Sequence, residues 1–165
     1  MKLKICLSWA AVAVWMLIIF GFSAQPAHES SQISHGVTKV IVDTVEKIAP
    51  SAEFDISQLN HIVRKNAHFF VYFALALLVF NAVRMHGMKG FKGFVLALCI
   101  CAVYAATDEF HQSFVPGRGP QARDVLIDSS GAFLGLCIYS LFVKIKDWKK
   151  GEVSVPVGLS QSKSR

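Results

Sequence analysis

Four long apolar runs, separated by short polar segments, constrain the fold of this chain more than any other feature. They lie at about residues 5–22, 66–83, 91–107 and 125–143. At a helical rise of about 1.5 Å per residue, each run comes near the roughly 30 Å thickness of a bilayer's hydrocarbon core. The chain of 165 residues is also 53% hydrophobic, with a mean hydropathy of +0.46. We therefore predict an all-α integral membrane protein built as a four-helix bundle.

The domain organisation follows from these runs. We place a single membrane domain at residues 1–147 and a cytoplasmic basic tail at 148–165, and we expect disorder from Lys144 onwards. The first run could instead be a cleaved signal peptide, because small residues lie at its end near Ser23. Its length and its two tryptophans favour a retained membrane anchor.

The segment between the first two runs, residues 23–63, is polar to amphipathic. Helical spacing is kept by Val37, Val40, Ile41, Val45 and Ile48. Pro50 stops this pattern. At about 40 residues the segment is marginal as an independent domain. We expect an amphipathic helical segment at the outer face, which either lies along the membrane surface or caps the bundle.

The distribution of lysine and arginine predicts how the chain crosses the membrane. With the amino terminus inside, the predicted inner segments hold eleven of these residues and the outer segments hold six. Positive residues favour the cytoplasmic side. We therefore expect both termini in the cytoplasm, which places the polar segments around Arg64 and Arg118 on the outer face.

Polar and charged residues gather where the apolar runs meet these outer segments. One group opens the second run, one ends the third run, and one spans the next loop and the start of the fourth run. The candidate ligand-binding residues are Arg64, Lys65, His68, Tyr72, Asp108, Glu109, Gln112, Arg118, Arg123, Asp124 and Asp128. Charged groups at or inside an apolar segment are costly, so by default they mark a functional site.

Several interpretations fit this set of residues. The acids and bases could form an ionic lock that closes the bundle. They could bind an anionic or amphiphilic ligand, because arginine makes bidentate contacts with anionic groups. In an enzyme site the catalytic candidates are His68, Asp108 and Glu109, with His111 as another base. Metal binding is a further interpretation, because histidine and carboxylates are suitable ligands.

Known sequence motifs exclude few of these interpretations. The chain contains no HExxH, GxSxG, P-loop or Cys-His pattern, so we expect neither a metal nor another cofactor. Its net charge is +6, but the basic residues lie mainly at segment ends, and no motif of interleaved aromatic and basic residues is present. We therefore expect no nucleic-acid partner. The oligomeric state is not indicated.

Two glycines in the fourth run suggest a close helix contact. Gly131 and Gly135 share one helical face with Asp124 and Asp128. Small residues four apart let two helices approach closely. We expect this face to point inward, against a neighbouring helix.

Four stretches of the sequence resemble the VanZ-like family, in order and with a spacing that fits four spans. They are FSAQP at 22–26, RKNAHFFVYF at 64–73, TDEFHQ with FVPGR at 107–118, and RDVLID with a following glycine at 123–131. The resemblance implies a small integral membrane protein linked, through the family's namesake, to low-level resistance to the glycopeptide teicoplanin. It does not imply a reaction. One departure is Asp128, which stands where the family pattern usually has asparagine.

We expect this protein to act at the outer face of a bacterial cytoplasmic membrane. Its expected partner is a membrane lipid or a lipid-linked envelope component, or a glycopeptide antibiotic. The alternative is a membrane-embedded enzyme that acts on a lipid-linked envelope substrate. A transporter subunit ranks lower, because four spans leave little room for alternating access without oligomerisation.

Overall fold

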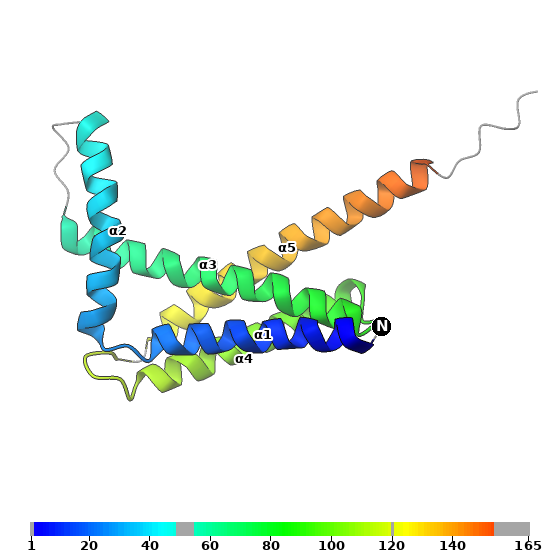
Figure 1. Ribbon diagram of the computed structural model, residues 1–165, viewed down its shortest axis with the longest axis horizontal. Helices are drawn as coiled ribbons and strands as arrows, with labels where there is room; N and C mark the ends of the chain where they lie inside the picture. The colour runs from blue at the N-terminus through cyan, green and yellow to red at the C-terminus, as the bar shows by residue number, and fades with distance from the viewer. Residues whose placement is uncertain (1, 49–54, 120, 154–165) are drawn as a thin grey trace, which may run out of the picture.

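The computed structural model describes residues 2–48, 55–119 and 121–153, which form five helices and no strand (Figure 1). The helices are α1 (Lys2–Ser23), α2 (Ala27–Ile48), α3 (Ile56–Met85), α4 (Gly90–Gln112) and α5 (Ala122–Val153). The all-α prediction is confirmed. Four of the helices, namely α1, α3, α4 and the Ala122–Lys149 part of α5, are long and apolar enough to cross a membrane. The predicted number of spans is therefore confirmed too.

The surface of these four helices is apolar rather than polar. Large side chains such as Leu17, Phe91 and Val103 are exposed by 69%, 81% and 64%. Contiguous exposed apolar surface of this kind is rare on soluble monomers and marks membrane or partner contact. The exposure therefore fits a bundle that is surrounded by lipid.

The helices extend beyond the apolar runs that predicted them. α3 begins at Ile56, ten residues before the apolar run at 66–83, because the Asp55 side chain caps it by accepting hydrogen bonds from the backbone N–H groups of Ser57 and Gln58. α4 continues to Gln112, and α5 continues to Val153. The disorder expected from Lys144 is therefore wrong as far as Val153, and the rest of the tail lies outside the described residues.

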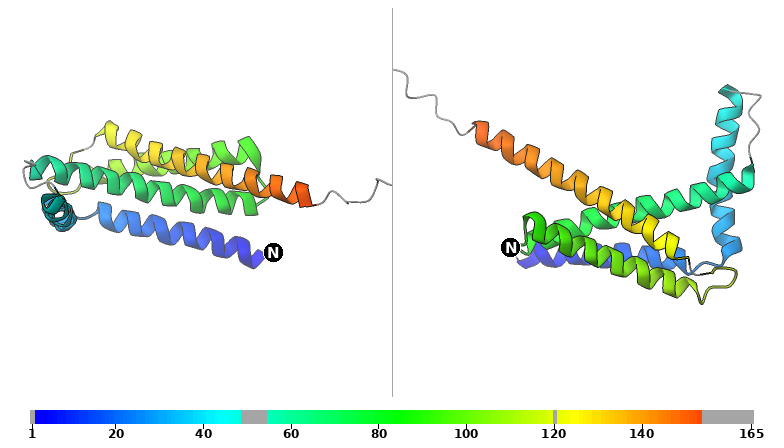
Figure 2. Two further views of the ribbon diagram at one scale, coloured as in Figure 1. Left: turned by 90° about the horizontal axis from the view of Figure 1, so that it is seen from above. Right: turned by 180° about the vertical axis from the view of Figure 1, so that it is seen from behind.

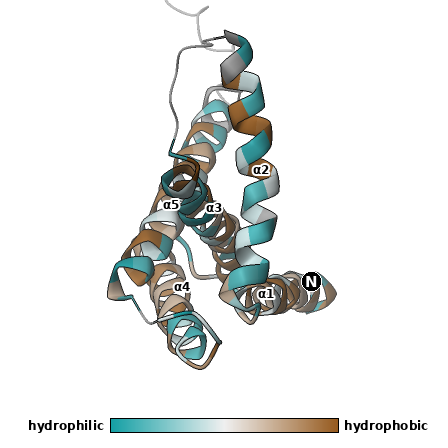
Figure 3. Cartoon of the chain, turned by 90° about the vertical axis from the view of Figure 1, so that its left-hand side faces the viewer, coloured by the Kyte–Doolittle hydropathy of each residue, from teal (hydrophilic) through white to brown (hydrophobic). Residues whose placement is uncertain are grey.

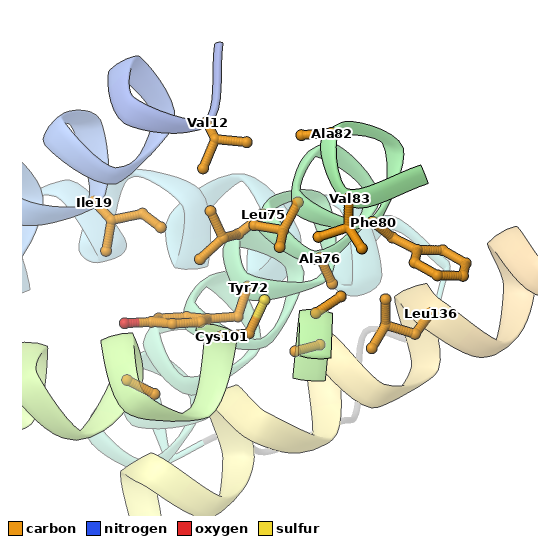
Figure 4. Packing of buried hydrophobic residues seen from close by; sticks show 14 residues of the cluster. Val12, Ile19, Tyr72, Leu75, Ala76, Phe80, Ala82, Val83, Cys101 and Leu136 are labelled. Atoms are coloured by element: carbon orange, nitrogen blue, oxygen red, sulfur yellow. The ribbon is translucent and has the colours of Figure 1, made fainter. Parts of the chain in front are cut away.

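α3 is the central helix, and each of the other four helices contacts it. Its buried face carries Tyr72, Leu75 and Phe80, which pack with Cys101 of α4 and Leu136 of α5 (Figure 4). Burying a large apolar side chain stabilises a water-soluble fold by about 1.5–3 kcal/mol. Between helices in lipid the gain comes instead from close packing. Small residues and polar links are therefore important in this bundle.

The glycine prediction is confirmed at the contact between α3 and α5. A Cβ atom built on Gly135 would lie 2.7 Å from the backbone oxygen of Phe73, and one built on Gly131 would collide with the backbone of Phe69. Only glycine allows the two backbones to approach so closely. This contact fixes where Asp124 and the rest of the first turns of α5 lie relative to α3.

Polar links hold α1 against the bundle. The indole Nε1 of Trp15 donates a hydrogen bond of 3.0 Å to the carbonyl of Val71 in α3. The hydroxyl of Tyr104 in α4 donates one of 2.6 Å to the carbonyl of Met16. Hydrogen bonds across helices add about 1 kcal/mol each in membranes. α1 is thereby set in register with α3 and α4.

α2 is the amphipathic helix predicted between the first two spans, and it already begins at Ala27. It runs roughly perpendicular to α1 and crosses the first turns of α3 (Figures 1 and 3). The side chain of Asn60 in α3 bonds to Ser31 at 3.0 Å and to Thr38 at 3.4 Å. Val40 on α2 is 66% exposed. Pro50, the expected stop, lies outside the described residues.

The bundle has two different ends. The first residues of α1, the turn between α3 and α4, and the last turns of α5 lie at one end (Figures 1 and 2). α2 and the loop between α4 and α5 lie at the other end. The polar residues singled out from the sequence belong to this second end, which we call the α2 end.

Candidate functional site

Several side chains that are rarely buried lie close together inside the α2 end. Asp108, Glu109 and Gln112 of α4 are exposed by 3%, 7% and 8%, and Asp128 of α5 is exposed by 3%. They occupy the last turns of α4 and the second turn of α5, so each helix brings its acids to the same level. Acidic side chains are almost never this buried unless they are paired. Their partners therefore decide what the site does.

The side chain of Asp108 is held by hydrogen bonds from Gln112 on the same helix and from Ser23 on α1. Its Oδ2 atom accepts a hydrogen bond of 2.8 Å from the hydroxyl of Ser23 and one of 3.2 Å from the amide of Gln112. Its Oδ1 atom is buried and has no hydrogen-bond partner. Sequence reasoning missed Ser23, although it lies in the FSAQP stretch that resembles the family. One oxygen of this carboxylate is thus fixed in place while the other is left open.

Asp128 lies opposite a histidine. Its Oδ1 atom is 3.8 Å from Nδ1 of His68 on α3 and has no hydrogen-bond partner. Ligand atoms of His68, Asp108 and Asp128 all lie within 4.8 Å of one another. The hydroxyl of Tyr72, one turn further along α3, is fully buried and also lacks a partner. Polar atoms from α3, α4 and α5 therefore lie close together, and three of them have no hydrogen-bond partner.

An ionic lock would require the acids and bases at the rim of the site to pair with one another, and only some of them do. Lys65 and Asp124 form an ion pair of 2.9 Å between α3 and α5, with side chains 20% and 31% exposed. A partly exposed pair of this kind contributes about 0.2–1 kcal/mol. Glu109 accepts a hydrogen bond from the backbone N–H of Gln121, which ties the loop before α5 to α4. These links shape the rim, and within the described residues neither Asp108 nor Asp128 pairs with a lysine or arginine.

Two arginines near these acids are without ion pairs. Within the described ranges, neither Arg64 nor Arg118 has a carboxylate oxygen within 4.0 Å. Nε of Arg118 is buried and has no hydrogen-bond partner. Burial and the nearby charge of Arg64 lower the pKa of Arg118 from its ordinary value, against the opposing effect of the neighbouring acids. A guanidinium nevertheless remains protonated in proteins. Both arginines are therefore available to an anion.

Two adjoining cavities open at this end. A polar cavity of about 100 Å³ lies between α3, α5 and the loop that carries Arg118. A cavity of about 260 Å³ lies between α1, α2 and α3, with a lining that is mostly apolar and includes Ile19, Phe22 and Val71. Arg64 and His68 line both cavities. A polar space and an apolar space therefore meet at the same two side chains.

The structure places the predicted residues as follows. The polar cavity is lined by Arg64, Lys65, His68, Gln112, Arg118, Asp124 and Asp128. Tyr72, Asp108 and Glu109 are buried outside that lining. Arg123 is exposed and does not line either cavity. His61 and Gln121 line the polar cavity, and sequence reasoning did not include them in the site.

Of the two histidines predicted as possible catalytic bases, His68 lines the cavities and His111 does not. The ring of His111 stacks against Phe20 with 4.4 Å between centroids, and it lines neither cavity. His68 faces the cavities, but within the described residues no hydrogen bond joins it to a serine, threonine or cysteine. An activated nucleophile needs such a bond to its base. Among the described residues, His68 is therefore not hydrogen-bonded to a nucleophile of this kind.

One comparison with known proteins identifies a family. The family model described as VanZ/LLP1 matches residues 8–143, which include the second and third spans, most of the first and fourth, and the whole site. No curated protein and no solved structure gives a match.

Proposed function

Because this chain belongs to the VanZ-like family, we propose that it binds an anionic amphiphile at the outer leaflet of a bacterial cytoplasmic membrane. The amphiphile is a lipid, a lipid-linked envelope component or an acylated glycopeptide, and its binding would alter envelope or teicoplanin tolerance. The observation that supports this most directly is the junction of a polar and an apolar cavity at Arg64 and His68. An amphiphile has the same two parts joined at one point.

The polar cavity supplies what an anionic head group needs. Arg64 and Arg118 line it and have no ion pair within the described ranges. Guanidinium groups bind phosphate and carboxylate through two parallel hydrogen bonds, which are stronger than neutral ones. Lys65 already has a partner in Asp124 and would shape the rim rather than bind the head group. The head group is therefore assigned to the two arginines.

The second cavity supplies what an acyl chain needs. Its lining includes Ile19 and Phe22 of α1, Val37 of α2, and Val63 and Val71 of α3. Burying apolar groups beside apolar side chains is favourable in proportion to the area removed from water. This cavity lies between two spans, so a chain inside it would be continuous with the surrounding lipid. Head group and chain would then be held at one membrane boundary.

The outer face is supported by charge. The end with the α3–α4 turn and the last turns of α5 carries the larger share of lysine and arginine, which favours the cytoplasm. The α2 end is then external. Exposed Val37 and Val40 on α2 suit a helix at the boundary between lipid and water. Both termini would be cytoplasmic.

Glu109→Gln is expected to abolish the protein's effect on teicoplanin tolerance while leaving its amount in the membrane near normal. The glutamine oxygen can still accept from the N–H of Gln121, so the fold is preserved, but the negative charge that attracts Arg118 and helps to hold it at the cavity is lost. The measurement compares minimal inhibitory concentrations and membrane levels in cells that express each form. Glu29→Gln, which changes an exposed acid of α2, is the matched control.

Retention of full tolerance by Glu109→Gln, Asp108→Asn and Asp124→Asn alike would mean that the acids serve only packing or topology. Envelope lipids and glycopeptide precursors should be profiled in the same cells. A new or missing envelope species that depends on His68 would favour the membrane-embedded enzyme instead. An unchanged profile with altered tolerance would favour binding.

A further inference from the structure

We propose that His68, Asp108 and Asp128 bind a divalent transition-metal ion, and that zinc is the ion that suits them. This site lies beneath the polar cavity and goes beyond the binding of an amphiphile, because it requires no lipid. The three residues come from α3, α4 and α5 and provide one imidazole and two carboxylates.

The geometry is close to that of a three-ligand site. The three ligand atoms lie within 4.8 Å of one another, and Nδ1 of His68 is 3.8 Å from Oδ1 of Asp128. Zinc binds nitrogen and oxygen ligands at about 2.0–2.2 Å in tetrahedral sites, so its ligand atoms lie roughly 3.4 Å apart. The side chains therefore need to close by no more than about 1.5 Å around the ion, a change on the scale of side-chain adjustment.

The two carboxylates are unsatisfied in a way that a cation would correct. Oδ1 of Asp108 and Oδ1 of Asp128 are both buried without a hydrogen-bond partner, on residues that are 3% exposed. Within the described part of the chain, no lysine or arginine forms an ion pair with either acid. Buried charges in proteins are normally paired or coordinate metals. A bound ion would give both acids their missing partner.

Hydrogen bonds from neighbouring side chains orient Asp108, as they commonly orient side chains that bind a metal. The second oxygen of Asp108 accepts from Ser23 and from Gln112, which orients the carboxylate and leaves Oδ1 free. Hydrogen bonds of this kind commonly fix metal-binding carboxylates and histidines. His68 and Asp128 also line the polar cavity, which gives an ion a way in and leaves a fourth position open toward the cavity.

The donor set selects the class of ion. Imidazole suits zinc and other transition metals, whereas magnesium and calcium favour ligands that are all oxygen. The sequence led us to expect no metal, because the ligands are 40 and 20 residues apart and form no local motif. Only the packing of three helices brings them together.

Zinc binding to the purified, tag-free full chain in detergent, after chelator treatment, tests this proposal. Isothermal titration with zinc alone should show one tight ion per chain, with magnesium binding at least a hundredfold more weakly. His68→Gln and Asp128→Asn should each lower zinc affinity at least tenfold. His35→Gln and Asp43→Asn, which change an exposed histidine and an exposed acid of α2, should bind zinc as the unmodified chain does.

A second measurement avoids dependence on the variants. The side chain of His68 is 28% exposed, so diethyl pyrocarbonate can reach it in the unmodified protein. Zinc should slow modification of His68 at least fivefold, as read by mass spectrometry, and should leave His61 unchanged. Equal modification of His68 with and without zinc, or undiminished zinc affinity in correctly folded His68→Gln, would overturn the proposal. If a variant fails to fold, the protection measurement decides.

Discussion

Replacing both Arg64 and Arg118 with alanine is expected to weaken binding of phosphatidic acid by about a hundredfold or more. Each guanidinium would lose a hydrogen bond to a charged group, which contributes about 1.5–3 kcal/mol, and each 1.4 kcal/mol is a factor of ten in affinity. The measurement is photo-labelling of the purified protein by a phosphatidic acid with a photoactivatable acyl chain, titrated over lipid concentration. Adducts should fall on the cavity that contains Ile19 and Val71.

Two controls separate the head-group contact from general lipid contact. Arg123→Ala removes an exposed arginine that does not line the cavities, and it should label like the unmodified protein. Diacylglycerol with the same chains lacks the phosphate and should label poorly in every form. Undiminished labelling of the double variant, or adducts spread evenly over exposed residues such as Phe91 and Leu134, would contradict the assigned head-group site.

Gly131→Leu is expected to cause the largest loss of stability of any single change in the spans. Even the first carbon of the new side chain would collide with the backbone of Phe69, so α5 must move away from α3. Overpacking commonly costs about 1–3 kcal/mol, and the rigid backbone here puts the change at or above the upper end. The melting temperature in detergent and the amount of protein in the membrane should both fall.

Gly21→Leu is the matched control for that change. Gly21 also lies in a span, but a Cβ atom there would meet nothing within 4 Å. It should therefore leave the melting temperature close to that of the unmodified protein. A Gly131→Leu form as stable as Gly21→Leu would mean that α5 does not need its close approach to α3.

The sequence predicted the number of spans, whereas the helices continue beyond the predicted apolar runs, for one physical reason. An apolar run indicates only the part of a helix that lies in lipid. The helix itself continues for as long as its backbone hydrogen bonds continue. α3 therefore begins at its cap, Asp55, and α4 continues through the polar residues to Gln112. The same applies to α5, which stays helical past the end of its apolar run at Val143 as far as Val153.

The site was predictable as a set of residues but not as a set of contacts. Acids at the ends of two spans had to reach the same membrane boundary, so their convergence follows from topology. The rotation of each helix about its axis decides which side chains face inward, and sequence periodicity fixes that only approximately. Arg123 and His111 do not line the cavities, while Ser23 of α1 donates a hydrogen bond to Asp108.

The groups that surround Asp128 are decided by the packing of the helices. Burial and neighbouring acids favour its neutral form, whereas a close arginine would favour its charged form, and the sequence does not decide between them. Within the described residues its nearest basic atom is Nδ1 of His68, at 3.8 Å, and no arginine pairs with it. Asp128→Asn is therefore compatible with the fold, and its effect should appear in ligand or ion binding.

The proposed function requires the α2 end to face outward, and cysteine labelling tests this. In a variant that lacks the four native cysteines, Gly119→Cys would report the α4–α5 loop and His86→Cys the α3–α4 turn. Both positions are exposed, and His86 avoids the strained backbone of Gly87, whose φ is +98°. An impermeant thiol reagent added to intact cells should label Gly119→Cys and not His86→Cys. The reverse pattern would place the site in the cytoplasm and contradict the proposed function.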